Sequence, residues 1–276
     1  MMQGTPSQTA LGSAVLRAVH VREDPKPWIL EDTISELLLN EQERSVISAE
    51  IASWPPGVAG ALRLSHVVRT RLAEDVAVEG IDLGRRRYVL LGAGLDSFAW
   101  RHPRAGAFEI VEIDHPATQA WKRHRLASRG LREPHNLRFV SVDLAKGPLD
   151  ALDCRTPTTW SWLGVTMYLD PVAVGGVLSQ IAESPDGTTL VVNFLLAEEV
   201  LDSAAKLVRA ASQRTVTRSG EPIRSTFTRE QCEEMLDRAG FGSVELLDGE
   251  SLATRYFAGR PELQLPATTL IAVASV

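Results

Sequence analysis

The segment VLLGAGLDSFAWR joins a strand-like apolar run to residues that could hold a nucleotide-like ligand. The run ends at Gly92–Gly94, and glycine at a strand end lets the backbone turn sharply and approach a ligand closely. Glu112 and Asp114 end a second apolar run about 20 residues further on, where a ribose-binding carboxylate is expected, and Asp143 ends a third. Glycines at the ends of strands can also serve only to form a turn, without binding a ligand. Because parallel strands end at one edge of a sheet, the three strand ends together predict an adenosine site.

The residues after the glycines bear on which ligand the turn would hold. A dinucleotide loop carries a third glycine that brings its helix close, and the pyrophosphate lies at the helix N-terminus. Here Ser97 takes that position and Asp96 precedes it. This carboxylate would repel a pyrophosphate but would suit S-adenosylmethionine, whose sulfonium and ammonium groups are cationic. The pattern therefore favours S-adenosylmethionine, although Asp96 could also be the N-cap of the helix-like SFAWR.

A sheet with helices between its strands would have to position these residues. From Tyr88 onward, strand-like and helix-like runs alternate, which predicts an α/β fold whose mainly parallel sheet is covered on both faces. Helices are predicted over 116–130, 171–184 and 228–241, the last with a capping box of Thr228 and Gln231. No helix is predicted between the last two strands, so we expect them to pair at the sheet edge, at least one of them antiparallel. The predicted strands are 87–94, 107–114, 136–144, 158–169, 188–196, 243–248 and 268–276.

The residues before the first strand have a helical pattern instead. Helices are predicted over 9–20, 33–39 and 58–78, separated by DPKPW and WPPG. A second insertion spans about 195–225. Because ligands of open α/β sheets lie beyond the carboxyl ends of the strands, we predict a helical cap over 1–80, packed on a catalytic domain over 81–276 that has a lid insertion at about 195–225. Extra packing around the sheet is the alternative for each segment.

Bulk composition excludes several classes of protein. The 276 residues are 44% hydrophobic and 23% charged, which suits a globular protein with a sizeable core. The net charge of −6 argues against a general binder of nucleic acid or membrane surfaces. Cys154 and Cys232 lie far apart without metal-ligand spacing, which predicts reduced thiols and no metal site. With no signal-peptide pattern and no membrane-length apolar run, we expect a cytoplasmic protein. The oligomeric state stays open.

Four segments resemble, in order, the motifs of the leucine carboxyl methyltransferase family: YVLLGAGLDSFAWR, EIVEIDHPATQAWKRHRL, RFVSVDL and SWLGVTMYL. The resemblance is strongest to its bacterial branch of polyketide O-methyltransferases, of the tetracenomycin carboxyl methyltransferase type. SQTALGSAVLRAVH, LRLSHVVRTRLAED and GEPIRSTFTREQ also resemble that branch, so the similarity runs from about Ser7 to Phe241. It implies a class I methyltransferase (Rossmann-like) fold with seven strands, the last antiparallel. It also implies S-adenosylmethionine as cofactor and S-adenosylhomocysteine as product.

The resemblance further implies roles for individual residues. Arg69 would pair with the cofactor's carboxylate, since guanidinium and carboxylate form a bidentate, charge-assisted pair, and Arg71 is the alternative. Asp114 would bind the ribose hydroxyls, with Glu112 beside it. Gly92 and Gly94 would lie against the methionine part, and Asp143 and Leu144 would flank the adenine. Beyond the resemblance, Asp96, His115 and Trp162 are further candidate cofactor contacts.

One position departs from the family pattern. The eukaryotic members carry a glutamate in the fourth-strand motif, near the methionine end of the cofactor, where this chain has Leu163. Trp162 and the local backbone would have to replace that contact, while Tyr168 stays as in the family. The departure argues against a protein-phosphatase substrate and favours a small-molecule acceptor.

The acceptor decides whether a general base is needed. A carboxylate is ionised at neutral pH, whereas a phenol, with a pKa near 10, benefits from a base such as histidine. His20 and Tyr168 are the catalytic candidates and His115 is a further histidine to consider, although a lone histidine is more often structural. The candidate substrate contacts are Arg17, Asn193, Arg224 and Tyr256.

The residues and the resemblance together predict an S-adenosylmethionine-dependent O-methyltransferase. Its acceptor would be a carboxyl or phenolic hydroxyl of a small, polyketide-like secondary metabolite. Two alternatives stay open: a scaffold that binds S-adenosylmethionine for other chemistry or none, and an NAD-dependent oxidoreductase. Asp96 and Ser97 in place of a third glycine argue against the second.

Overall fold

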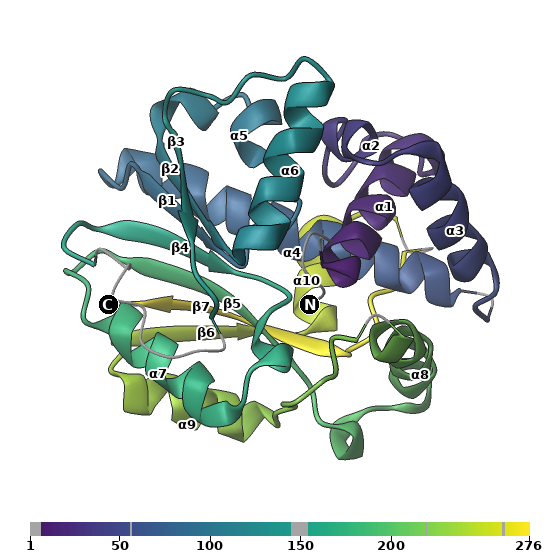
Figure 1. Cartoon of the computed structure of the whole chain (residues 1–276). Helices are drawn as coiled ribbons and strands as arrows, with labels where there is room; N and C mark the ends of the chain where they lie inside the picture. Colours follow the sequence, from purple (N-terminus) through teal and green to yellow (C-terminus); the bar gives the residue numbers. More distant parts are fainter. Residues whose placement is uncertain (1–6, 56, 145–153, 219, 261–262) are drawn as a thin grey trace.

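The computed structural model describes residues 7–55, 57–144, 154–218, 220–260 and 263–276. These residues form a seven-stranded sheet in the order β3-β2-β1-β4-β5-β7-β6 (Figure 1). Each strand lies within a run that the sequence predicts. The strands are β1 Arg87–Leu91, β2 Glu109–Asp114, β3 Leu137–Ser141, β4 Thr158–Trp162, β5 Thr189–Leu195, β6 Ser243–Leu247 and β7 Thr269–Ser275.

Helices precede the sheet and connect its strands. They are α1 Gln8–Glu23, α2 Ile34–Leu38, α3 Glu41–Ala52, α4 Val58–Asp82, α5 Phe98–Arg101, α6 Pro116–Ser128, α7 Pro171–Ala182, α8 Ser203–Arg218, α9 Arg229–Ala239 and α10 Gly249–Tyr256. Short 3-10 helices occupy Ala105–Ala107, Thr166–Tyr168 and Glu198–Val200. The predictions omit α3, none of whose residues is buried, so its apolar pattern is weak. A capping box of Asn40 and Glu43 marks its start and is visible in the sequence.

The directions of the strands confirm a mainly parallel sheet with an antiparallel last strand. Strands β1 to β5 run parallel, and β7 is antiparallel to both β5 and β6. The prediction that the last two strands pair at the sheet edge is confirmed, with β6 as the edge strand and β7 between β6 and β5. The prediction that no helix separates these strands is wrong. Helix α10 lies between them and packs Leu252 and Phe257 against α4.

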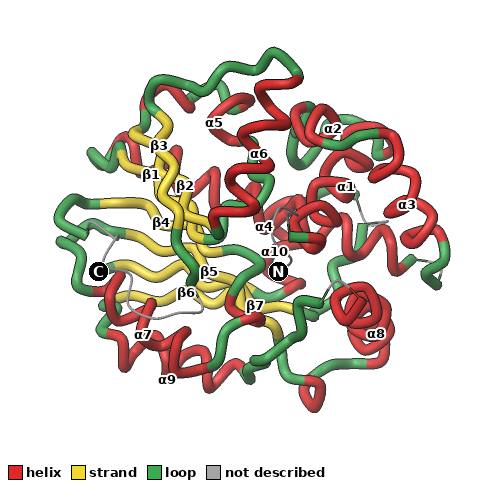
Figure 2. The backbone as a smooth tube through the Cα atoms, in the orientation of Figure 1, coloured by secondary structure: helices red, strands yellow, loops and turns green. Residues whose placement is uncertain are grey.

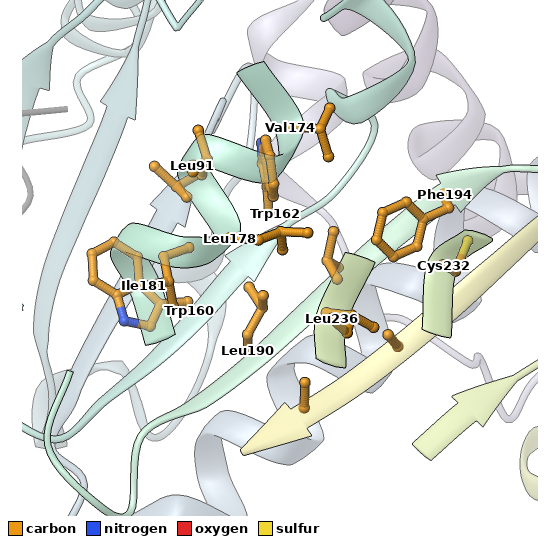
Figure 3. Packing of buried hydrophobic residues seen from close by; sticks show 14 of the residues in the cluster. Leu91, Trp160, Trp162, Val174, Leu178, Ile181, Leu190, Phe194, Cys232 and Leu236 are labelled. Carbon is orange, nitrogen blue, oxygen red and sulfur yellow. The ribbon is translucent and has the colours of Figure 1, made fainter. Parts of the chain in front are cut away.

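Both faces of the sheet are buried, as expected for a mainly parallel sheet. On one face, α7 and α9 cover Trp160 and Trp162 of β4, which are fully buried beneath Val174 and Leu178 (Figure 3). On the other face, α4 packs its own apolar stripe, Leu64, Val67, Val68, Leu72 and Val76, against Val191 and Ile271. This double cover holds the strand ends in fixed positions, which a precise site requires.

Helices α1, α2, α3 and α8 gather beyond one end of the sheet (Figure 2). Helix α1 packs on α4 and α2, burying the stripe of Leu11, Val15 and Val19 that the sequence pattern indicates. Because this is the end at which the parallel strands finish, the added helices cover the edge where a ligand is expected. Among the described helices, none has the length and apolar character needed to cross a bilayer.

Candidate active site

A cavity of ≈ 460 Å³ lies at the carboxyl ends of the parallel strands. It is enclosed by these strand ends, by α1, α3 and α4, and by parts of the segment 195–224, including one face of α8. This volume is within the range of small-molecule sites. The sequence-predicted residues that line it are Arg17, Arg69, Gly92, Gly94, Asp96, Asp114, His115, Asp143, Leu144, Tyr168 and Arg224.

The glycine turn after β1 has the conformation that its sequence suggests. Gly92 has φ +63° and Gly94 has φ +54°, a left-handed region that favours glycine. A Cβ on Gly92 would lie only 2.3 Å from Cγ2 of Val165. Both the backbone angle and the contact therefore require glycine at this position, and the turn brings bare backbone to the cavity wall.

The two strand-end carboxylates come together beside this turn. Asp114 accepts hydrogen bonds from the backbone N–H groups of Gly94 and of His115, the latter at 2.6 Å. Burial raises the pKa of Asp114, although these two N–H groups oppose the shift. Asp143, just after β3, lines the same cavity. Carboxylate oxygens accept hydrogen bonds, so Asp114 is suited to hold hydroxyl groups.

Asp96 accepts a hydrogen bond at the start of a helix, which is one of the two roles that the sequence suggests. Its Oδ1 accepts a hydrogen bond from the backbone N–H of Phe98 at 2.8 Å, at the start of α5. Asp96 also lines the cavity. One carboxylate can therefore cap the helix and present negative charge to a cationic ligand.

Arg69 brings positive charge into the cavity from α4. No group in the described ranges forms a hydrogen bond or an ion pair with its guanidinium, and burial together with Arg17 lowers its pKa to about 10. It therefore remains a cation at neutral pH, and an anionic ligand would relieve the cost of burying it. Arg71, the alternative candidate, is not placed to bind the cofactor's carboxylate. Its guanidinium bonds Asp75 at 2.7 Å and the Ile29 carbonyl at 2.9 Å, outside the cavity lining.

This donor set fits S-adenosylmethionine. A buried cation without a described anionic partner suits the carboxylate of an amino acid, and a strand-end carboxylate suits ribose hydroxyls. The bare backbone of Gly92–Gly94 lines the same cavity beside Asp114. The same set lacks the third glycine and the free helix N-terminus that a pyrophosphate would use.

The model of the leucine carboxyl methyltransferase family matches residues 10–182. The chain belongs to the leucine carboxyl methyltransferase family. YktD of Bacillus subtilis, named as an S-adenosyl-L-methionine-dependent methyltransferase, is 32% identical to this chain over an alignment of 291 positions, gaps included, that covers 95% of each chain. A protein of Mycolicibacterium paratuberculosis with the same description is 34% identical over 52% of this chain and 49% of its own.

Solved structures share the fold of this methyltransferase. A methyltransferase structure from Thermobifida fusca superposes with a TM-score of 0.59 at 17% identity, covering 99% of this chain and 95% of its own. A DUF574 family protein from Streptomyces avermitilis gives 0.56 at 17% identity, with 95% and 96% covered. The chain is thus an S-adenosylmethionine-dependent methyltransferase of the class I fold.

Two of the predicted cofactor residues do not reach the cavity of the methyltransferase. Glu112 is fully buried in an ion pair with Lys122 at 2.5 Å, beneath α6. Trp162 points into the core under α7 (Figure 3). Neighbouring residues of a strand point to opposite faces, so Leu163 lines the cavity while Trp162 does not. Both predictions are corrected on this ground.

His20 is not available as a general base. Its Nδ1 bonds Asp24 at 2.6 Å, and its Nε2 accepts from the backbone N–H of Ile29 at 3.1 Å. The ring is fully buried and lies outside the cavity lining. His20 instead joins the end of α1 to the chain that follows it.

Two predicted substrate residues also lie outside the cavity lining. Tyr256 donates a hydrogen bond to Asp75 at 2.9 Å, joining α10 to α4. Asn193 is fully buried in β5, and its Oδ1 accepts from the N–H of Gly164 at 2.5 Å. Asn193 therefore acts on the site indirectly, by fixing the loop after β4.

Arg17 lines the cavity, but its guanidinium is engaged elsewhere. It bonds Asp32 at 2.8 Å, Ser13 at 2.9 Å and the Leu95 carbonyl at 2.7 Å. Asp32 in turn accepts from Ser97 at 2.8 Å. This buried network joins α1 to the loop after the glycine turn, and sequence reasoning missed it because its members are scattered along the chain.

The cavity is also lined by Tyr168, His115 and Arg224. Neither Tyr168 nor Nδ1 of His115 can act as a general base. Burial raises the pKa of Tyr168, so its hydroxyl keeps its proton and can donate but not act as a base. Nδ1 of His115 accepts from the N–H of Ala117 at 3.2 Å and caps α6. Nδ1 of His115 is therefore also unavailable as a base.

Sequence reasoning missed two further residues of the cavity. His66 lies on α4 one turn before Arg69, and Glu221 follows α8. The three-residue spacing of His66 and Arg69 on one helix was the available signal. No comparable signal marks Glu221, whose partners Ser7 and Thr9 lie at the other end of the chain.

Replacing Gly164 by alanine is expected to weaken binding of S-adenosylhomocysteine by about 10-fold, equivalent to ~1.4 kcal/mol. Gly164 has φ +73°, and a Cβ there would lie 3.0 Å from Nη2 of Arg69. Gly187→Ala is the control, since Gly187 has φ +84° with open space around it. Both variants should lose similar stability, but only the first should lose affinity by calorimetry. Equal affinities would show that Gly164 does not position Arg69.

Proposed function

We propose that this methyltransferase transfers a methyl group to a carboxyl or phenolic hydroxyl oxygen of a small, polyketide-like secondary metabolite. The observation that carries the proposal is the division of the cavity. Its lining combines the charged and polar groups at the strand ends and Arg69, which suit the cofactor, with a separate apolar cluster of Leu16, Ile51, Trp54 and Leu62. Leu163, at the position of the family glutamate, lines the same cavity, which supports a small apolar acceptor.

The cofactor end would use residues of the strand ends and α4. Arg69 would hold the carboxylate and Asp96 would face the cationic groups. Asp114 would accept from the ribose hydroxyls. The backbone of Gly92–Gly94 would lie against the methionine part. Asp143, Leu144 and His115 would enclose the adenosine.

The acceptor end is formed where four helices meet. Leu16 of α1, Ile51 and Trp54 at the end of α3, and Leu62 of α4 line it and pack with α8. A surface of this kind buries an aromatic or aliphatic acceptor favourably, by about 25 cal/mol per Å² of apolar area. Tyr168 and Arg224 line the same cavity and would contribute polar contacts.

Methyl transfer depends mainly on how the acceptor and the cofactor are positioned. S-adenosylmethionine supplies an activated methyl group when bound. The chain has to hold the acceptor oxygen in line with that group and keep water away, which the position of the cavity between the strand ends and the helices α1, α3, α4 and α8 favours. An acceptor carboxylate would need no base, whereas a phenol would.

We also propose that the cap over 1–80 and the insertion at about 195–225 act together as the cover of the site. Glu221, after α8, accepts hydrogen bonds from Ser7, at 3.0 Å, and from Thr9, at the start of α1. Tyr168 hydrogen-bonds Thr9 from the cavity wall. These contacts join the two segments directly above the site, although residues 1–6, 56 and 219 lie outside the described part of the chain.

Calorimetry should detect binding of S-adenosylhomocysteine, and a thermal-shift screen should show stabilisation by it but not by NAD. A ligand at 100 times its Kd stabilises the native state by about 2.7 kcal/mol, an easily measured shift. Stabilisation by NAD alone would favour the oxidoreductase. Binding without methyl transfer to any of a panel of phenols and carboxylic acids would favour a non-catalytic scaffold.

A further inference from the structure

His66 lines the cavity and has one ring nitrogen without a described hydrogen-bond partner. It lies on α4, one turn before Arg69. Its Nδ1 is 2.8 Å from the Leu62 carbonyl oxygen. A carbonyl can only accept, so Nδ1 carries the proton and Nε2 of the neutral ring carries a lone pair. None of the hydrogen bonds found among the described residues engages Nε2.

Its surroundings keep this ring neutral. Burial lowers the pKa of His66 well below its usual value, and the cations of Arg69, on the same helix, and Arg17, on α1, lower it further. At pH 7 the ring is therefore a hydrogen-bond acceptor at Nε2 and not an imidazolium. A carboxylate paired with Arg69 would offset one of these cations and make Nε2 more basic.

The position of His66 along α4 is between the two ends of the cavity. Leu62, one turn earlier, belongs to the apolar acceptor end, and Arg69, one turn later, belongs to the cofactor end. Residues three and four apart share one face of a helix, so all three side chains face the cavity in sequence. An acceptor that reaches from the apolar end toward the cofactor passes His66.

We infer that Nε2 of His66 takes the proton from the acceptor, and that the acceptor is therefore a phenolic hydroxyl and not a carboxylate. The inference rests on the proposed function. A phenol is largely protonated at pH 7 and has a proton to give, whereas a carboxylate has none. In His20, Nε2 already accepts a backbone hydrogen bond, and in His115, Nδ1 does so. Nε2 of His66 accepts none from the described residues.

The step balances with the groups named. The O–H bond of the phenol breaks and its proton forms a bond with the lone pair of Nε2. The oxygen uses an electron pair to bond the methyl carbon, while the sulfur–carbon bond breaks and sulfur keeps its pair. The sulfonium charge is thus replaced by an imidazolium charge, and His66 returns its proton to water after the products leave.

The protonation of His66 can be observed without turnover. The full chain, labelled with ¹⁵N-histidine and saturated with S-adenosylhomocysteine, is examined at pH 7 by long-range ¹H–¹⁵N correlation, with His66→Asn to assign the ring. We expect a proton on Nδ1, none on Nε2, and a shift of the Nε2 resonance on addition of 2-naphthol. A proton on Nε2, or no shift with 2-naphthol, would overturn the inference.

Turnover supplies the second readout. His66→Asn keeps an amide N–H that can reach the Leu62 carbonyl but lacks Nε2, and it should slow methyl-ether formation from 2-naphthol by about 10²-fold or more. His66→Gln, whose amide can hydrogen-bond but cannot take a proton, should be as slow as His66→Asn, and His135→Asn, at an exposed position, should change nothing. If the enzyme instead forms the methyl ester of 2-naphthoate, and His66→Asn does so at the same rate, the inference is overturned while the proposed function stands. If the wild-type chain shows no binding of S-adenosylhomocysteine, the proposed function itself is overturned.

Discussion

Replacing Asp32 by alanine is expected to lower the free energy of unfolding by about 3–5 kcal/mol, the range for a broken buried ion pair. Asp32 is 1% exposed and bonds Arg17 at 2.8 Å, Ser35 at 2.6 Å and Ser97 at 2.8 Å. Without it, Arg17 and Arg101 would face each other as buried cations with less negative charge between them. The loop that follows the glycine turn would also lose its anchor on α1.

Urea denaturation followed by circular dichroism measures this effect. Glu31→Ala is the matched control, because it removes an exposed carboxylate from the neighbouring position. Its effect should stay within about 0.5 kcal/mol, as for surface substitutions in general. A loss below about 1 kcal/mol for Asp32→Ala would mean that the network adds little to stability, which is possible only if water reaches Arg17 in the variant.

The pH dependence of stability follows from the same residue. Burial would raise the pKa of Asp32, but Arg17 and Arg101 outweigh it and lower the pKa to about 2. A carboxyl whose pKa is depressed on folding contributes stability above its unfolded pKa near 3.9 and loses it as pH falls toward the folded value. The wild type should therefore lose stability more steeply than Asp32→Ala between about pH 4 and pH 2.

The strand ends explain why the cofactor side of the site is predictable from sequence. Gly92, Gly94, Asp114 and Asp143 each follow an apolar run, and the parallel order of β1, β2 and β3 brings them to one place. Periodicity alone then fixes their approximate position. It does not fix the orientation of a side chain next to the strand end, and Trp162 was assigned to the wrong face for this reason.

The histidines show what sequence reasoning could not reach. His20 and His66 both lie on helices near the site, and only their tertiary partners differ. Ile29 and Leu30 donate to Nε2 of His20, across a turn whose geometry no spacing rule predicts. His66 bonds a carbonyl of its own helix, lines the cavity, and has no described hydrogen bond to Nε2. Choosing between them required the positions of the neighbouring segments.

Arg69→Met is expected to weaken binding of S-adenosylhomocysteine by at least about 30-fold, equivalent to the ~2 kcal/mol lower bound for truncating one partner of a buried charge pair. Methionine keeps an unbranched, apolar stem at this position but lacks the charge and the donors of the guanidinium. Arg69→Lys should lose about 10-fold, because lysine keeps the charge but not the bidentate geometry. Arg71→Met, on the same helix but paired with Asp75, should bind normally.

A second ligand separates a direct contact from a change in fold. 5′-Methylthioadenosine has no carboxylate, so Arg69→Met should bind it as the wild type does, and the difference between the two ligands isolates the pairing energy. The ligand-free variant should also keep or raise its melting temperature, because an apolar side chain replaces a partly buried cation that has no anionic partner in the described chain. Equal loss of affinity for both ligands would show that Arg69 acts by shaping the cavity, and the carboxylate of the cofactor would then need another partner.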